Sequence, residues 1–260
     1  MNNTFEYIKQ ELVMTFKTRI RYKVGIVSDL VIMSLTYIFV YFFQTGLLLE
    51  IYYDTTKANG NILFLLGFLF WQFGTLSLGF TTSMITEESA TGKLEMKMQG
   101  KYALSFIYFI KLLANLMTNI LLFIFVILIT LVLGTHDIDF LRLILSVLFT
   151  IPSILGMYGM GLIIGALTLK EKNISSFVII IQTMLIFVSN AIAPIDYWII
   201  KLIPFSQGID LARNFYLGKT SEVIYYIIYI SINLCWLLIG IALFNFFLKR
   251  ERMYGSFDTY

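Results

Sequence analysis

The chain has 260 residues, of which 58% are hydrophobic and 13% charged, and its mean hydropathy is +0.83. Soluble domains carry about 25% charged residues, so this composition excludes a soluble globular protein and indicates an integral membrane protein. The net charge of +3 is small, no nucleic-acid partner is expected, and the single Cys235 offers no disulfide framework. Apolar runs of about 20 residues recur without the alternation typical of barrel strands. The predicted fold class is therefore an all-α polytopic membrane protein with one membrane domain over residues 1–260.

Residues 1–23 are predicted to form an amphipathic helix in the membrane interface. Apolar side chains recur there every three or four positions, with cations beside them: Phe5, Ile8, Leu12, Phe16 and Ile20, then Lys9, Lys17, Arg19, Arg21 and Lys23. This spacing gives one apolar helix face and lets the cations reach anionic headgroups. A merely solvated basic tail is the alternative.

Six transmembrane helices are predicted from the apolar runs. They cover residues 24–43, 62–83, 106–133, 141–169, 174–192 and 223–248, and a polar loop is expected at 44–61. Asp29 lies about one turn inside the first span, where an ion pair with Lys23 or Lys111 is favoured over a transport role. In the fourth span Pro152 predicts a kink, and Gly161-x-x-x-Gly165 predicts close helix packing within the chain.

A polar stripe marks the third span. Lys111, Asn115 and Asn119 recur four residues apart, so they share one helical face. Such a stripe either packs against other helices through hydrogen bonds or lines a polar translocation path. Packing is the favoured interpretation, and mutation of the three residues would separate the two.

The stretch 193–221 is too polar, and too broken by Pro194, Pro204 and Gly208, to span a bilayer. Its Trp198–Ile200 is nevertheless too apolar for a free loop. Short re-entrant or interfacial helices satisfy both observations, so they are predicted before the last span.

The cations predict the orientation. Most of the 19 Lys and Arg fall on one side if both termini, the 84–101 loop and the 170–172 turn face the cytosol. The other side then holds only Lys57, Arg142, Lys201, Arg213 and Lys219. A multi-pass protein of the cell membrane with both termini cytoplasmic is predicted, and the abundance of Ile, Phe, Asn and Tyr favours a bacterial source.

The charged loop at 84–101, MITEESATGKLEMKMQGK, separates the second and third spans. It begins with an acidic pair, is broken at Gly92, and resumes with a helix-favouring pattern. Leu94 and Met98 are four residues apart and share one helical face. A loop of this kind is suited to docking on a cytosolic partner.

Catalytic constellations are not found in the sequence. Leu217–Thr220 looks like the end of a phosphate-binding loop, but Arg213 stands where that motif requires glycine. His136 is the single histidine and is predicted on the face opposite Glu87-Glu88, so no acid/base or metal set assembles. An enzyme is therefore not expected, and no cofactor is predicted in this chain.

The layout as a whole resembles the type-two export permeases of ATP-binding-cassette (ABC) transporters. The most specific part is residues 85–98, where six residues occupy the family's loop positions: Glu87, Glu88, Gly92, Leu94, Glu95 and Met98. Lys93 stands where threonine is usual, and Gln99-Gly100 replaces the usual proline-containing close. The resemblance implies that this loop is a coupling helix seated on a separate ATPase subunit.

The resemblance also implies the partners and the activity. Two ATPase subunits, which bind ATP and magnesium, would join two permease chains, either identical or different, in the bilayer. The expected activity is export of an amphiphilic or hydrophobic compound such as a drug, antibiotic, peptide or lipid. Export of lipid-linked polysaccharide, with aromatic residues of the first span stacking on sugars, is one alternative. A membrane sensor or partner protein without transport is another.

Overall fold

The computed structural model describes residues 2–43, 47–132, 138–171 and 174–254, and every regular element within these ranges is a helix. The elements are α1 (Asn2–Arg21), α2 (Lys23–Phe43), α3 (Leu47–Tyr53), α4 (Lys57–Ala90), α5 (Lys93–Met98), α6 (Leu104–Val132), α7 (Phe140–Leu148), α8 (Thr150–Lys170), α9 (Ser175–Val188), the 3-10 turn η1 (Ile200–Leu202), α10 (Ser206–Tyr216) and α11 (Val223–Tyr254). The predicted all-α membrane fold is confirmed.

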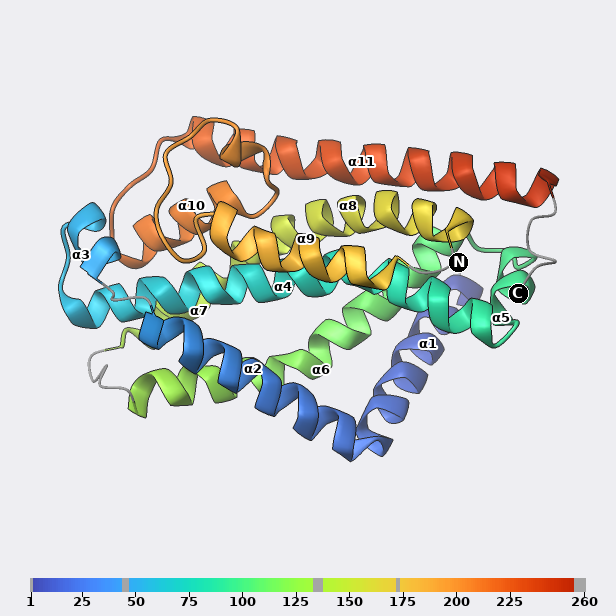
Figure 1. Cartoon of the computed structure of the whole chain (residues 1–260), viewed down its shortest axis with the longest axis horizontal. Coiled ribbons are helices and arrows are strands. Elements are labelled where there is room, and N and C mark those ends of the chain that lie inside the picture. The colour runs from blue at the N-terminus through green and yellow to red at the C-terminus, as the bar shows by residue number, and fades with distance from the viewer. Residues whose placement is uncertain (1, 44–46, 133–137, 172–173, 255–260) are drawn as a thin grey trace.

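Five helical stretches are long and apolar enough to cross a bilayer: α2, α4, α6, the α7–α8 pair and α11. The fifth predicted span, 174–192, is helical only over the 14 residues of α9. At about 1.5 Å per residue α9 covers roughly 21 Å of a core about 30 Å thick. Residues 189–199 carry the chain on from α9 to the end of the molecule that holds α10 (Figure 1).

The expected loop at 44–61 contains more helix than its polarity suggested. Leu49 and Tyr53 lie four residues apart on the short helix α3 and are both buried. α4 begins at Lys57, where the Thr56 hydroxyl accepts a hydrogen bond from the Asn59 amide at 3.4 Å. This cap satisfies one of the free amides at the start of a helix, so the helix begins before the apolar run does.

The predicted kink in the fourth span is a break at Phe149 between α7 and α8. Pro152 lies in the first turn of α8, where its missing N–H costs nothing. A continuous helix would instead press the proline ring against the carbonyl of Leu148, the last residue of α7.

The core is built around α4 and α8. α4 is apolar on all sides and is buried along most of its length, as expected for a central helix. α8 packs between α4 and α11. A Cβ atom placed on Gly161 would lie 2.5 Å from the Leu78 carbonyl oxygen of α4, so this glycine permits the close approach. The intramolecular packing predicted for Gly161-x-x-x-Gly165 is confirmed.

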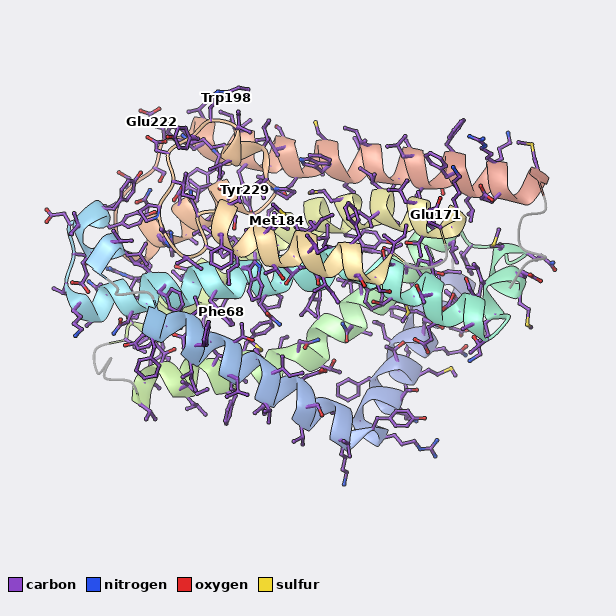
Figure 2. All side chains as sticks on the ribbon, in the orientation of Figure 1. Phe68, Glu171, Met184, Trp198, Glu222 and Tyr229 are labelled. Carbon is purple, nitrogen blue, oxygen red and sulfur yellow. The ribbon has the colours of Figure 1, made fainter. Side chains whose placement is uncertain are left out.

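The two ends of the bundle carry different elements (Figure 1). One end, called the α5 end, holds α5, the start of α1 and the last turns of α11. The other, called the α10 end, holds α3, α10 and the segment before it. Figure 2 places Trp198 and Glu222 at the α10 end, and Glu171 lies toward the α5 end.

Candidate functional site

The turn between α4 and α5 forms the tip of the α5 end. α4 continues through Met84–Ala90, so only the second half of the 84–101 loop forms a separate structure. The Thr91 hydroxyl donates to the Glu87 carbonyl at 3.0 Å, and Gly92 has a φ of 66°. Glycine adopts this left-handed backbone without strain, so Gly92 reverses the chain into α5.

Glu88, in the last turn of α4, is the centre of a buried charge cluster. One carboxylate oxygen accepts hydrogen bonds from the Lys97 ammonium of α5 and, at 2.9 Å, from the Lys111 ammonium of α6. The other accepts from the Tyr108 hydroxyl at 2.9 Å. Because the Glu88 side chain is only 5% exposed, its charge depends on these partners rather than on water. The carboxylate therefore joins α4, α5 and α6.

The cluster extends to α1. The Lys111 ammonium also lies 3.6 Å from the Glu11 carboxylate. The rings of Tyr7 and Tyr102 stack with centroids 4.6 Å apart, which adds an aromatic contact between α1 and the turn before α6. α1 is therefore attached to the same unit as α5, through one ion pair and one ring stack.

The six residues predicted to contact an ATPase subunit divide into two groups. Glu87, Gly92 and Glu95 are exposed. Glu88, Leu94 and Met98 are buried at 4%, 2% and 7% exposure, and the last two belong to the main apolar core. The apolar face that Leu94 and Met98 share is therefore turned into this chain, and contact of these two residues with an ATPase subunit stays a prediction. Met96, with 75% of its surface exposed, is the apolar residue of α5 that faces outward.

A cleft of about 900 Å³ lies among α1, α2, α4, α6 and α9. Its α5 end is charged, and its further lining alternates between amides, hydroxyls and large apolar side chains. Among the lining residues are Glu11, Lys97, Gln72, Thr75, Gln182, Met33, Trp71 and Phe80. Within this lining the Gln182 amide donates to the Thr75 carbonyl at 2.8 Å, and the Trp71 indole donates to the Gln182 carbonyl at 2.9 Å. The lining of the cleft is thus amphiphilic, and hydrogen bonds between α4 and α9 hold one of its sides in place.

The predicted polar stripe of α6 faces this cleft. Lys111, Asn115 and Asn119 all line it. They are not equivalent, because Lys111 is bound to Glu88, while the buried Asn119 amide donates to the Asn115 carbonyl at 2.7 Å. Asn115 is half-buried, and within the described residues its side chain makes no hydrogen bond. It is the member of the stripe that is most available to a bound molecule.

A second polar network holds the α10 end together. Arg213 is fully buried; its guanidinium donates at 2.9 Å to the carbonyls of Leu63 on α4 and Ala191 after α9. Asp210, one turn earlier on α10, accepts from the Tyr53 hydroxyl at 2.8 Å and the Asn190 amide at 2.7 Å. Burial raises the pKa of the Asp210 carboxyl, and the nearby guanidinium opposes this only in part.

This network explains why the segment before the last span, where short helices were predicted, stays packed against the bundle. Because α10 and the 189–195 segment are tied to α4 by buried polar bonds, they remain packed on the bundle. Leu217–Thr220 lies in the turn after α10, where Lys219 donates to the Tyr53 carbonyl at 2.6 Å. Lys219, which stands at the lysine position of the incomplete phosphate-loop motif, is thus bonded to the backbone of this chain.

No group of three or more His, Cys, Asp or Glu residues suited to a metal ion occurs within the described parts of the chain. His136, the histidine considered in the sequence, lies outside the described residues. Among the described residues, the Glu88 cluster with its cleft and the Arg213 network at the other end are the two polar centres that border a cavity.

Comparison of the sequence with models of known protein families finds a match. A model described as ABC-2 type transporter matches residues 4–217. The matched part runs from α1 to the end of α10 and includes the cleft and the whole Glu88 cluster. No curated protein matches the chain.

Proposed function

The chain belongs to the ABC-2 type transporter family, and from this premise we propose that it is the permease of an exporter for amphiphilic compounds. It is a membrane subunit of an ABC transporter. The proposal adds the direction of transport, the class of cargo and the way in which energy reaches the cleft. Membership in a transporter family also favours this reading over a membrane sensor without transport.

The observation that carries the proposal is the connection between α5 and the cleft. Glu88 and Lys111 belong both to the charge cluster that fixes α5 and to the lining of the cleft. A force applied to the exposed tip of α5 therefore reaches the cleft through two ion pairs, without passing through a flexible loop. ATP and magnesium would be held by a separate ATPase subunit that docks on this tip.

The chemistry of the cleft supports an amphiphilic cargo. Its lining places Gln72, Thr75 and Asn115 beside Met33 and Phe80, so both a polar head and an apolar body find partners. Polar side chains within spans are unfavourable against lipid, so we propose that a second permease chain, identical or different, covers the open side. The α5 end would face the cytosol, as the distribution of cations predicts.

A polysaccharide cargo receives no support from the aromatic residues of the first span. Tyr37 is fully buried against Phe64 and Phe68, and its hydroxyl shares a hydrogen bond of 2.7 Å with the hydroxyl of Thr130. Phe39 and Phe42 are exposed on the outer surface of the helix. This row therefore serves packing and lipid contact and does not form one stacking surface.

The docking of the ATPase is tested by Met96→Asp. We expect the change to reduce co-purification of the ATPase subunit about tenfold, because burying a carboxylate in an apolar contact costs more than about 1.4 kcal/mol. The measurement is the ratio of ATPase to tagged permease after extraction from the native membrane. Met253→Asp is the matched control, since Met253 is also exposed, at 68%, but lies on α11. An unchanged ratio in Met96→Asp would contradict docking on α5.

The role of the cleft is tested by Asn115→Leu. We expect ATP-driven uptake of a fluorescent amphiphile into inverted vesicles, which corresponds to export from the cell, to fall at least fivefold, while the amount of assembled complex stays the same. The reason is that this side chain offers polar contact to the cleft and takes no part in internal hydrogen bonding among the described residues. Met117→Leu on the exposed face of the same helix is the control. Equal export by both variants would place the translocation path elsewhere.

A further inference from the structure

The α10 end carries a second cavity, of about 580 Å³, which is separate from the cleft. Its walls come from α3, the segment around η1, α10 and the turn into α11. The lining is predominantly polar: Tyr52, Tyr53, Asp196, Lys201, Gln207, Asp210, Leu211, Asn214, Lys219, Thr220, Ser221, Glu222 and Tyr225. A polar cavity bordered by tyrosine rings combines the polar and aromatic groups that are typical of a ligand site.

The cations of this cavity are already bound. Lys201 forms an ion pair with Asp196 at 3.3 Å, and Lys219 donates to the Tyr53 carbonyl at 2.6 Å. Glu222 is exposed, and no ion pair to its carboxylate is found within the described residues. The lining as a whole holds three carboxyl groups, those of Asp196, Asp210 and Glu222, against the two ammonium groups of Lys201 and Lys219, which favours a cationic ligand over an anionic one.

A buried acceptor points in the same direction. Gln207 is 5% exposed, and its side-chain amide nitrogen donates to the Tyr225 carbonyl at 3.0 Å. That bond fixes which end of the amide is the oxygen, and this oxygen has no hydrogen-bond partner among the described residues. Buried acceptors are normally satisfied, so a ligand with N–H donors would supply the partner that this oxygen lacks among the described residues.

The rings complete the site. Tyr52 and Tyr225 line the cavity and remain 54% and 44% exposed. An ammonium group is attracted to the face of a tyrosine ring as well as to a carboxylate. We propose that this cavity binds the primary ammonium group of an organic ligand, with Glu222 as its counter-ion, Gln207 as an acceptor and the two tyrosines beside its apolar part. The site lies outside the proposed translocation cleft and does not depend on transport.

Two sources can supply this group: the head of an ethanolamine lipid, or a free amine from the aqueous phase. The probe for the site itself is phenethylamine, compared with 2-phenylethanol, which has the same ring but no charge. Binding to the purified full-length chain in maltoside micelles is followed by ligand-observed saturation-transfer NMR. We expect saturable binding of the amine, with a Kd at least fivefold weaker in Glu222→Gln.

The control is Glu171→Gln, because Glu171 is also an exposed carboxylate and lies at a distance from the cavity (Figure 2). Its Kd for the amine should equal that of the unmodified chain. The proposal is overturned if amine and alcohol bind alike, or if Glu222→Gln changes the Kd no more than Glu171→Gln does. In nanodiscs, weaker amine binding with phosphatidylethanolamine than with phosphatidylcholine, which is also zwitterionic but has no primary amine, identifies the lipid head as the occupant. Equal binding in both identifies a free amine.

Discussion

Replacement of Gly240 by valine is expected to separate α11 from α8 and to prevent stable folding of the chain. A Cβ atom at Gly240 would lie 2.6 Å from the carbonyl carbon and 2.7 Å from the Cα of Gly159. Both atoms belong to backbone, so no side chain can move aside to make room. Helices in a bilayer associate through close van der Waals packing, and here the contact is lost along the helix pair with the most extensive packing.

The expected cost exceeds the about 1–3 kcal/mol that is usual for an overpacked side chain. It is measured as the loss of monodisperse protein after extraction and as a lower midpoint of thermal unfolding. Gly25→Val is the matched control, because no atom lies within 4 Å of a Cβ at Gly25. If Gly240→Val remained as monodisperse and as stable as Gly25→Val, this result would contradict the close backbone contact between α8 and α11.

Replacement of Glu88 by glutamine is expected to have the second largest effect. The variant keeps the shape of the side chain but leaves Lys97 without its counter-ion, and Lys111 with only the more distant Glu11. Breaking a buried ion pair costs about 3–5 kcal/mol, and the lower end applies because the Lys97 side chain remains 27% exposed. Loss of stability should be accompanied by loss of coupled transport, since α5 is then no longer fixed to α6.

The adjacent Glu87→Gln is the control, because Glu87 is exposed and should tolerate the change with little effect. Adding Lys97→Met to Glu88→Gln should restore part of the stability, since it removes the unpaired cation. The midpoint of thermal unfolding in detergent gives all three values. A double variant no more stable than Glu88→Gln, or a Glu88→Gln that equals Glu87→Gln, would show that the cluster is not a buried ionic network.

Much of the fold could be predicted from apolar periodicity. Runs of sufficient length located the spans, Pro152 located the helix break, and Gly161-x-x-x-Gly165 located a close contact. The short helix α3 was missed because a seven-residue helix in a polar stretch gives almost no periodic signal. The full length of the fifth span was overestimated, because an apolar run does not reveal that the helix ends at Val188.

The position of the 84–101 loop between two spans could be predicted from the sequence, but the orientation of its apolar face could not, and contact of this loop with an ATPase subunit stays a prediction. The spacing of Leu94 and Met98 gave one apolar face correctly, yet spacing alone does not tell whether that face meets the chain or a partner. A signal for Glu88 was present: Ile85 and Glu88 are three residues apart, so the carboxylate continues the buried face of α4. Tyr108 and Lys111 are likewise three apart on α6, and only folding brings them to Glu88.

The dependence of α8 on α11 has a consequence for biosynthesis. α8 uses glycines on both sides, and the nearest atoms to its Gly159 side belong to α11, which follows the other described helices in the sequence. Ribosomes add about 5–20 residues per second, so synthesis of the 32 residues of α11 takes about 2–6 s. During that interval the nascent protein displays a helix groove with no partner. A membrane protease or insertase that recognises such a groove would therefore distinguish chains that still lack α11 from chains that carry it.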